Sequence, residues 1–235
     1  FKLNIKHIIR SRLPIFIFVG LLISLIVKII AGPIFGTKIL GYWLILGCIY
    51  QALKGSYKAL YLFSFLVAID QFFNRWGLMM YNTLSILIIL LGLIFLFTRY
   101  KSLIRKRLQY YEIFLLLWIY WIFASIYWAP DLIRAIKMSM IEASGVFMVI
   151  IISRLLTSKT DIIQLSFYYL FGTFVGIIML STLYDPFGNA FIATESGLSM
   201  NGFGWETEIG PNVFGRVCAI AAIMSFFFID SNFFK

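Results

Sequence analysis

Long apolar runs constrain the fold of this chain more than any other feature of its sequence. The stretch Leu84–Phe97, LSILIILLGLIFLF, is apolar on every face of a helix, and similar runs follow one another along the chain. A run of about 18 residues, at about 1.5 Å per helical residue, covers the roughly 30 Å hydrocarbon layer of a bilayer. Hydrophobic residues make up 62% of the sequence and charged residues only 13%, whereas about 25% are charged in soluble domains. The sequence therefore predicts an all-α, polytopic integral membrane protein.

We expect about eight membrane-spanning helices and treat residues 1–235 as a single transmembrane domain. A β-barrel would need segments of about ten residues with alternating polarity, which these runs do not have. The predicted spans are residues 13–35, 39–53, 59–73, 77–98, 111–128, 138–156, 162–184 and 212–230. The second and third spans are short and only a few residues around Gly55 separate them, so they form either a tight hairpin or two tilted helices.

The positions of Lys and Arg predict the orientation of the chain. With a cytoplasmic N-terminus, most of the 20 basic residues fall in inner segments, including the cluster Arg99–Arg107, as the positive-inside rule requires. The loop 185–210 then lies outside the membrane, and it contains acidic but no basic residues. The net charge of +10 reflects this topology, so membrane lipids are expected partners and nucleic acid is not.

Motifs of common soluble-enzyme chemistry do not occur in the sequence. The only histidine, His7, lies in the basic N-terminal lead, which excludes Ser-His-Asp, Cys-His and HExxH arrangements within these residues. Cys48 and Cys218 fall inside predicted helices without metal-ligand spacing and are expected to be packing residues. Neither a phosphate loop nor a dinucleotide fingerprint is present. We therefore expect no metal and no cofactor.

The first candidate site is the predicted outer corner at residues 128–137. Pro130 and Asp131 are suited to the start of a helix, and Arg134 and Lys137 are spaced to share one face of it. Asp131 is either a helix cap or a general base. Arg134 and Lys137 either bind an anion or reach out to lipid headgroups.

The second candidate site is the end of the loop 185–210, where GPNVFGR leads into the last predicted span. Gly210 is followed by Pro211, which pre-sets a first helical turn, and by Asn212, which can cap its free N–H groups. Arg216 comes four residues after Asn212 and projects on the same side of the helix. A helix N-terminus with a nearby arginine is suited to bind an anion, so Arg216 is predicted to be an anion ligand.

Together the two segments resemble a known family. The segment WIFASIYWAPDLIRAIKMSM, a further pair of spans and a loop closed by NGFGWETEIGPNVFGRVCAIAA follow the order typical of the O-antigen ligase and polymerase family. The resemblance covers roughly residues 111–229. It implies a metal-independent glycosyltransferase of surface polysaccharide biosynthesis, acting on the outer face of the bacterial cytoplasmic membrane. The donor would be a glycan on undecaprenyl diphosphate, and the acceptor a lipid-anchored or growing glycan.

The resemblance also implies roles for the candidate residues. Positively charged side chains would take the place of a metal and stabilise the diphosphate as it leaves. The diphosphate contacts would be Arg216, Arg134 and Lys137, and the site-shaping residues Gly210, Pro211, Asn212 and Asp131.

This chain departs from the family pattern at two points. The family has an outer histidine proposed as the base, which is not found here. Met200 and Asn201 stand where members often carry an arginine before the loop glycine. Since the chain begins with Phe1 and stops at Lys235 just after a span, we expect a fragment of a protein with about ten to twelve helices, its base lying downstream.

A transporter or flippase for a lipid-linked or anionic substrate is the alternative function, and a non-catalytic assembly subunit a further one. A transporter would have broken helices and ionisable residues near mid-membrane in paired halves. Gly145, Gly172, Gly176 and Glu142 fit that pattern, but no internal repeat is visible. Glu142 either pairs with a basic residue of a neighbouring helix or is protonated.

Overall fold

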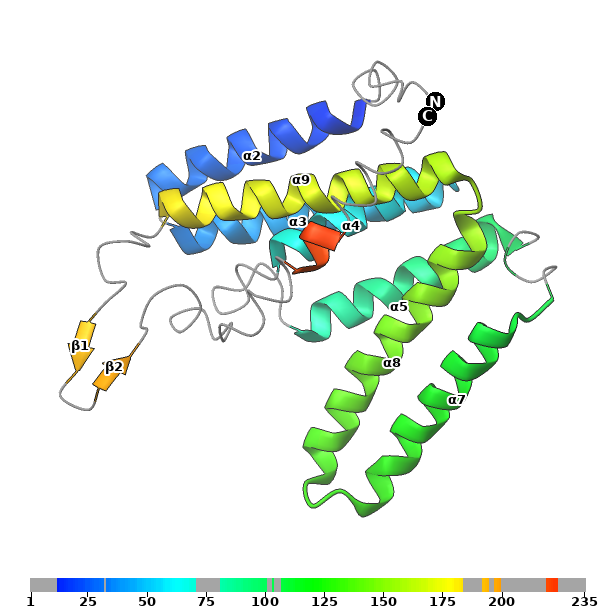
Figure 1. Ribbon diagram of the computed structural model, residues 1–235. Coiled ribbons are helices and arrows are strands. Elements are labelled where there is room, and N and C mark those ends of the chain that lie inside the picture. The colour runs from blue at the N-terminus through cyan, green and yellow to red at the C-terminus, as the bar shows by residue number, and fades with distance from the viewer. Residues whose placement is uncertain are drawn as a thin grey trace. The chain divides into compact units, whose positions relative to one another are not determined.

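A computed structural model describes residues 12–31, 33–70, 81–100, 103, 107–183, 192–194, 197–199 and 219–223. Helices form nearly all of this part of the chain, so the all-α prediction is confirmed (Figure 1). The α-helices are α2 (Arg12–Ala31), α3 (Pro33–Leu53), α4 (Lys58–Asp70), α5 (Tyr81–Thr98), α7 (Tyr110–Ala124), α8 (Leu132–Leu155) and α9 (Lys159–Leu183). The 3₁₀ turn η1 (Ser125–Trp128) follows α7, and the short strands β1 (Ile192–Thr194) and β2 (Gly197–Ser199) pair antiparallel.

Four helices in the described ranges are long and apolar enough to cross a membrane, which identifies a membrane protein. They are Arg12–Ala31, Tyr110–Trp128, Leu132–Leu155 and Lys159–Ile178. The segments Lys38–Leu53 and Thr83–Thr98 are apolar but shorter. Helix α4 has 13 residues, which at about 1.5 Å each do not reach across a hydrocarbon layer of roughly 30 Å. The expected count of about eight spans is therefore not confirmed.

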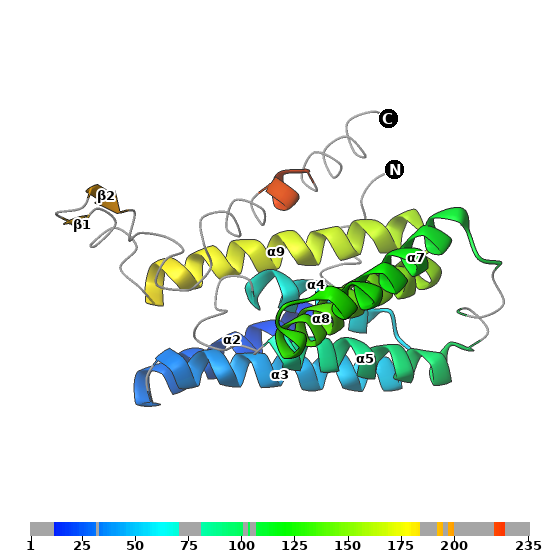
Figure 2. The same cartoon turned by 90° about the horizontal axis from the view of Figure 1, so that it is seen from below.

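The first two predicted spans meet at a different place from the one expected. Helix α2 ends at Ala31 and α3 begins at Pro33, whereas the sequence placed this boundary at residues 35–39. Proline is well suited to the first helical position, because it has no N–H to leave unpaired there. The two helices form an antiparallel pair in which Ser24 Oγ donates to Gly36 O over 2.8 Å (Figure 2).

Of the two alternatives for the next pair of helices, the structure has the tight hairpin. Gly55 has a φ of 62°, in the left-handed region. Its N–H bonds Ala52 O at 2.7 Å and the N–H of Ser56 bonds Gln51 O at 3.0 Å, the two bonds that define a Schellman helix ending. Arg99, just after α5, donates from Nε to Gly55 O at 2.8 Å and so ties α5 to this turn.

The chain divides into two compact units, which are described separately. The first contains α2, most of α3 and α4, and nearly all of α9. Helix α4 is buried along almost its whole length in this unit. It packs against α9, where Ser64 Oγ donates to Leu165 O over 3.1 Å and the rings of Tyr61 and Tyr168 stack at 5.8 Å.

The second unit contains the α3–α4 turn, α5, α7, η1 and α8. Helix α8 packs against both α5 and α7 (Figure 1). Its buried Ser144 donates to Ser85 Oγ of α5 over 3.2 Å, and its buried Ser139 donates to Ile122 O of α7 at 3.4 Å. The antiparallel α7–α8 hairpin carries the predicted outer corner at its turn and an ion pair near its open end.

Candidate functional site

The turn between α7 and α8 is built by short-range hydrogen bonds. Ser125 Oγ donates to Ile122 O over 2.7 Å, a bond that connects the first residue of η1 to the last turn of α7. Asp131 is the N-cap of α8, since its side chain accepts from the N–H of Arg134 over 3.0 Å. Of the two predicted roles for Asp131, the structure therefore shows the cap. This cap starts α8 at Leu132, earlier than the expected residue 138, and places Pro130 before the cap.

Replacing Asp131 separates its capping role from a catalytic one. Asp131→Ala is expected to lower the free energy of unfolding by about 1 kcal/mol, because an N–H at the helix start loses its acceptor. Asp131→Asn should change stability by much less, since asparagine caps as well. Thermal unfolding in detergent measures both variants. Loss of activity in Asp131→Asn with unchanged stability would contradict a purely capping role.

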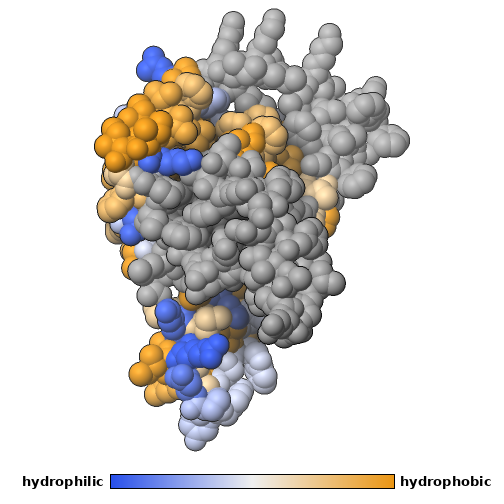
Figure 3. Space-filling view, turned by 90° about the vertical axis from the view of Figure 1, so that its left-hand side faces the viewer, coloured by the Kyte–Doolittle hydropathy of each residue, from blue (hydrophilic) through white to orange (hydrophobic). Residues whose placement is uncertain are grey.

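Arg134 and Lys137 lie on the first turns of α8, and both side chains are exposed. Neither side chain takes part in an ion pair with another residue that the structure describes. Figure 3 shows strongly hydrophilic side chains among hydrophobic ones at its lower end, where the α7–α8 turn lies. The Asp131 carboxylate already meets the positive N-terminal end of the helix dipole, so the exposed charges of Arg134 and Lys137 are what an anion would neutralise here.

A hollow of about 300 Å³ lies beside this turn, between α7 and α8. Its lining includes Trp118 and Trp121 of α7, Ser125 of η1, and Ser139 and Glu142 of α8. Arg134 and Lys137 are not part of the lining. None of the side chains that line the hollow is basic, so the structure shows no basic partner for Glu142 there.

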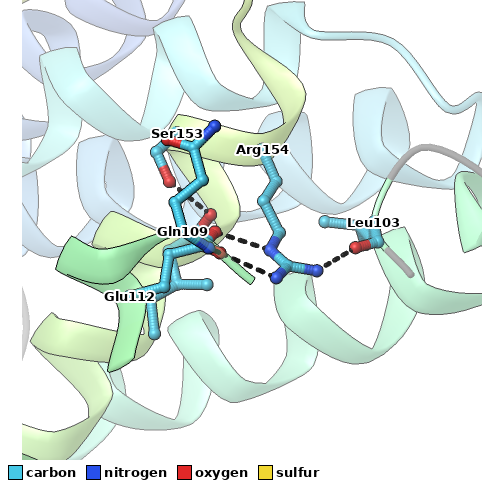
Figure 4. Close-up of polar contacts among 6 residues, drawn as sticks. Leu103, Gln109, Glu112, Ser153 and Arg154 are labelled. Carbon is cyan, nitrogen blue, oxygen red and sulfur yellow. Dashed lines mark hydrogen bonds and ion pairs between the residues drawn. The ribbon is translucent and has the colours of Figure 1, made fainter. Parts of the chain in front are cut away.

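An ion pair, with Glu112 buried, lies near the open end of the α7–α8 hairpin. Arg154 Nε contacts Glu112 Oε1 at 2.7 Å and Arg154 Nη2 contacts Glu112 Oε2 at 2.8 Å, a bidentate arrangement (Figure 4). Arg154 Nη1 also donates to Leu103 O. The side chains are 13% and 2% exposed for Arg154 and Glu112, respectively.

Glu112 has a second function at the start of α7. Its Oε2 accepts from the N–H of the N-cap residue Gln109 over 2.9 Å, as in a capping box. The carboxylate thus joins the start of α7, the end of α8 and the backbone at Leu103. Since its acceptors and the guanidinium donors are engaged within the protein, this cluster is a structural clamp and not a binding site.

The sequence alone did not predict this clamp. The Gln-x-x-Glu spacing of Gln109 and Glu112 is a capping-box signal that could have placed the start of α7. The pairing itself gives no such signal, because Glu112 and Arg154 are 42 residues apart. The sequence assigned Arg154 only to the basic inner segments.

The second predicted site lies outside the described residues. Its members are Gly210, Pro211, Asn212 and Arg216. Of the predicted site residues, the structure therefore brings together only those of the corner. The Asp131 side chain accepts a hydrogen bond from the backbone N–H of Arg134, and Lys137 lies about one turn further along α8. Within the described ranges, no group of three or more His, Cys, Asp or Glu side chains is arranged to hold a metal ion.

Comparisons with protein-family models, with curated proteins and with solved structures find no match to this chain.

Proposed function

We propose that this chain is part of a membrane glycosyltransferase of the O-antigen ligase and polymerase type, in the bacterial cytoplasmic membrane with its N-terminus in the cytoplasm. It transfers or polymerises a glycan from an undecaprenyl-diphosphate carrier on the outer face of that membrane. The acceptor is a lipid-anchored or growing glycan, and the product is a surface polysaccharide.

The observation that carries this proposal is the pair of exposed cations at the start of α8. Arg134 and Lys137 are exposed and have no ionic partner among the described residues. A diphosphate would pair with both side chains at once. Arg216, at the start of the last predicted span, would complete the set of charges around the leaving group.

Cation removal in the full-length protein tests the proposal. Arg216→Ala is expected to lower glycan transfer from a polyprenyl-diphosphate donor by about 100-fold, because the leaving diphosphate loses a charge that stabilises it. The double variant Arg134→Gln/Lys137→Gln is expected to lower transfer by at least about tenfold. Chromatographic separation of donor and product measures the rate.

The matched control is Arg107→Gln, since Arg107 is also exposed but lies at the opposite end of the α7–α8 hairpin. Its transfer rate should equal that of the unmodified protein. Transfer that is unchanged in the Arg216 variant and in the double variant would exclude these cations as the diphosphate site. If the unmodified full-length protein transfers no glycan, the enzyme assignment itself is wrong.

A further inference from the structure

The hollow between α7 and α8 is lined by an acidic and two indole side chains, which take no part in the proposed diphosphate site. Glu142 lies near the middle of α8 (Leu132–Leu155), a helix long enough to span a membrane. A carboxylate at that depth is costly unless a partner neutralises it. Its neighbours in the hollow supply no positive charge.

The nearest cations on α8 do not fill this role. Lys137 precedes Glu142 by five residues, which at about 100° per residue places it about 140° away around the helix. Arg134 is more than two turns away, a rise of about 12 Å along the axis. Neither residue lines the hollow. The charge of Glu142 is therefore open to a ligand.

The other polar groups of the hollow also favour a ligand that donates hydrogen bonds. Ser125 Oγ donates to Ile122 O over 2.7 Å, and Ser139 Oγ donates to the same carbonyl over 3.4 Å. The short bond commits the hydroxyl hydrogen of Ser125 and leaves its oxygen as an acceptor, whereas the 3.4 Å contact is too long to commit that of Ser139. The Ser125 oxygen and the Glu142 carboxylate therefore both act as acceptors in the hollow.

Two indole rings also line the hollow, beside the apolar side chains of Ile122, Ala129, Ala135 and Met138. Trp118 is 55% and Trp121 59% exposed, and both border the hollow beside Glu142. Indole is the best side-chain partner for an organic cation, which its electron-rich face attracts. A carboxylate, two indoles and a hydroxyl acceptor therefore select against an anion and for a positive group.

We infer that this hollow binds an organic ammonium group, held by the Glu142 carboxylate and the faces of Trp118 and Trp121. The site is separate from the diphosphate contacts at Arg134 and Lys137, and it takes the opposite charge. Its ligand is an amine-bearing substrate or amphiphile that reaches the hairpin from the membrane or from its outer surface. The inference stands without glycosyl transfer, because it rests on the hollow alone.

Small water-soluble probes test this inference on the full chain in an uncharged polyoxyethylene detergent. The probes are n-butylammonium, its neutral counterpart n-butanol, and methyl glucoside as a polyol. The readout is the difference in tryptophan fluorescence between the unmodified chain and Trp121→Phe, which isolates the signal of the hollow. We expect saturable binding of n-butylammonium, and binding of n-butanol that is at least about tenfold weaker.

Variants then identify the residues that hold the cation. Glu142→Gln should weaken n-butylammonium binding by at least about tenfold, Glu142→Asp by less, and Trp118→Leu by about threefold or more, each read against the same variant carrying Trp121→Phe. Asp161→Asn removes a carboxylate elsewhere, in the first turn of α9, and should change nothing. Thermal unfolding confirms that each variant is folded.

Three results would overturn the inference. Tighter binding of methyl glucoside than of n-butylammonium would make the hollow a polyol site. Equal binding of n-butylammonium and n-butanol would show that charge has no part in it. A folded chain that binds none of the probes would mean that Glu142 is neutralised by a proton or by another segment of the protein.

Discussion

Arg154→Ala is expected to lower the free energy of unfolding by about 3–5 kcal/mol, the usual cost of breaking a buried ion pair. The variant removes the guanidinium that neutralises the carboxylate of Glu112, which is 2% exposed and lies in a low-dielectric environment. It also removes the donor to Leu103 O. Glu112→Ala should cost less, because Arg154 is 13% exposed and its long side chain can turn toward water or headgroups.

A variant without either charge tests this clamp by its unfolding in detergent. Glu112→Leu/Arg154→Met removes both charges and should recover most of the stability lost in Arg154→Ala, since no unpaired charge remains. Arg107→Ala is the control for loss of an exposed arginine, and its effect should stay within about 0.5 kcal/mol. A double variant as unstable as Arg154→Ala would show that packing, and not the unpaired charge, carries the effect.

Gly172→Ala is expected to destabilise the first unit by about 1–3 kcal/mol through overpacking. A Cβ at residue 172 would lie 2.6 Å from the backbone oxygen of Phe65 and 2.9 Å from Cβ of Ala68. Because the nearest atom belongs to the backbone of α4, relief requires the two helices to move apart. A larger residue such as leucine should cost more.

Gly145 provides the matched control, since it is also a glycine within a long helix. A Cβ at residue 145 meets nothing within 4 Å, so Gly145→Ala should stabilise the protein by about 0.5–1 kcal/mol through helix propensity. Unfolding of both variants under the same conditions gives the comparison. Equal effects of the two substitutions would contradict the close approach of α4 and α9.

These glycines also bear on the alternative function. The transporter hypothesis used Gly145, Gly172 and Gly176 as signs of broken helices. In the structure α8 is continuous from Leu132 to Leu155 and α9 from Lys159 to Leu183. The described helices are not broken at these glycines, so the glycines do not support the transporter hypothesis. Gly172 has a packing role instead.

Local signals predicted the helices and several of their ends. The apolar runs located α2, α5, α7 and α9 to within a few residues, and Asp131 was expected as a possible cap at the corner. The errors also had local causes. Helix α3 begins at Pro33, whereas the apolar run of the sequence continues across this boundary between α2 and α3. Helix α8 begins after its cap at Asp131 and so includes residues 132–137. Hydropathy alone had placed its start later, because these residues include two charged side chains.

The amino-acid sequence alone was enough to predict an all-helical membrane protein, because the length and apolar composition of a segment do not depend on its neighbours. It did not determine which faces meet, since helices that are apolar on every side carry little directional pattern. The tertiary structure decided those contacts. It joined Glu112 to Arg154, pressed Gly172 against Phe65, and brought Glu142 to the lining of the same hollow as Trp118 and Trp121. Each of these joins residues from different helices, so no single segment could have specified it.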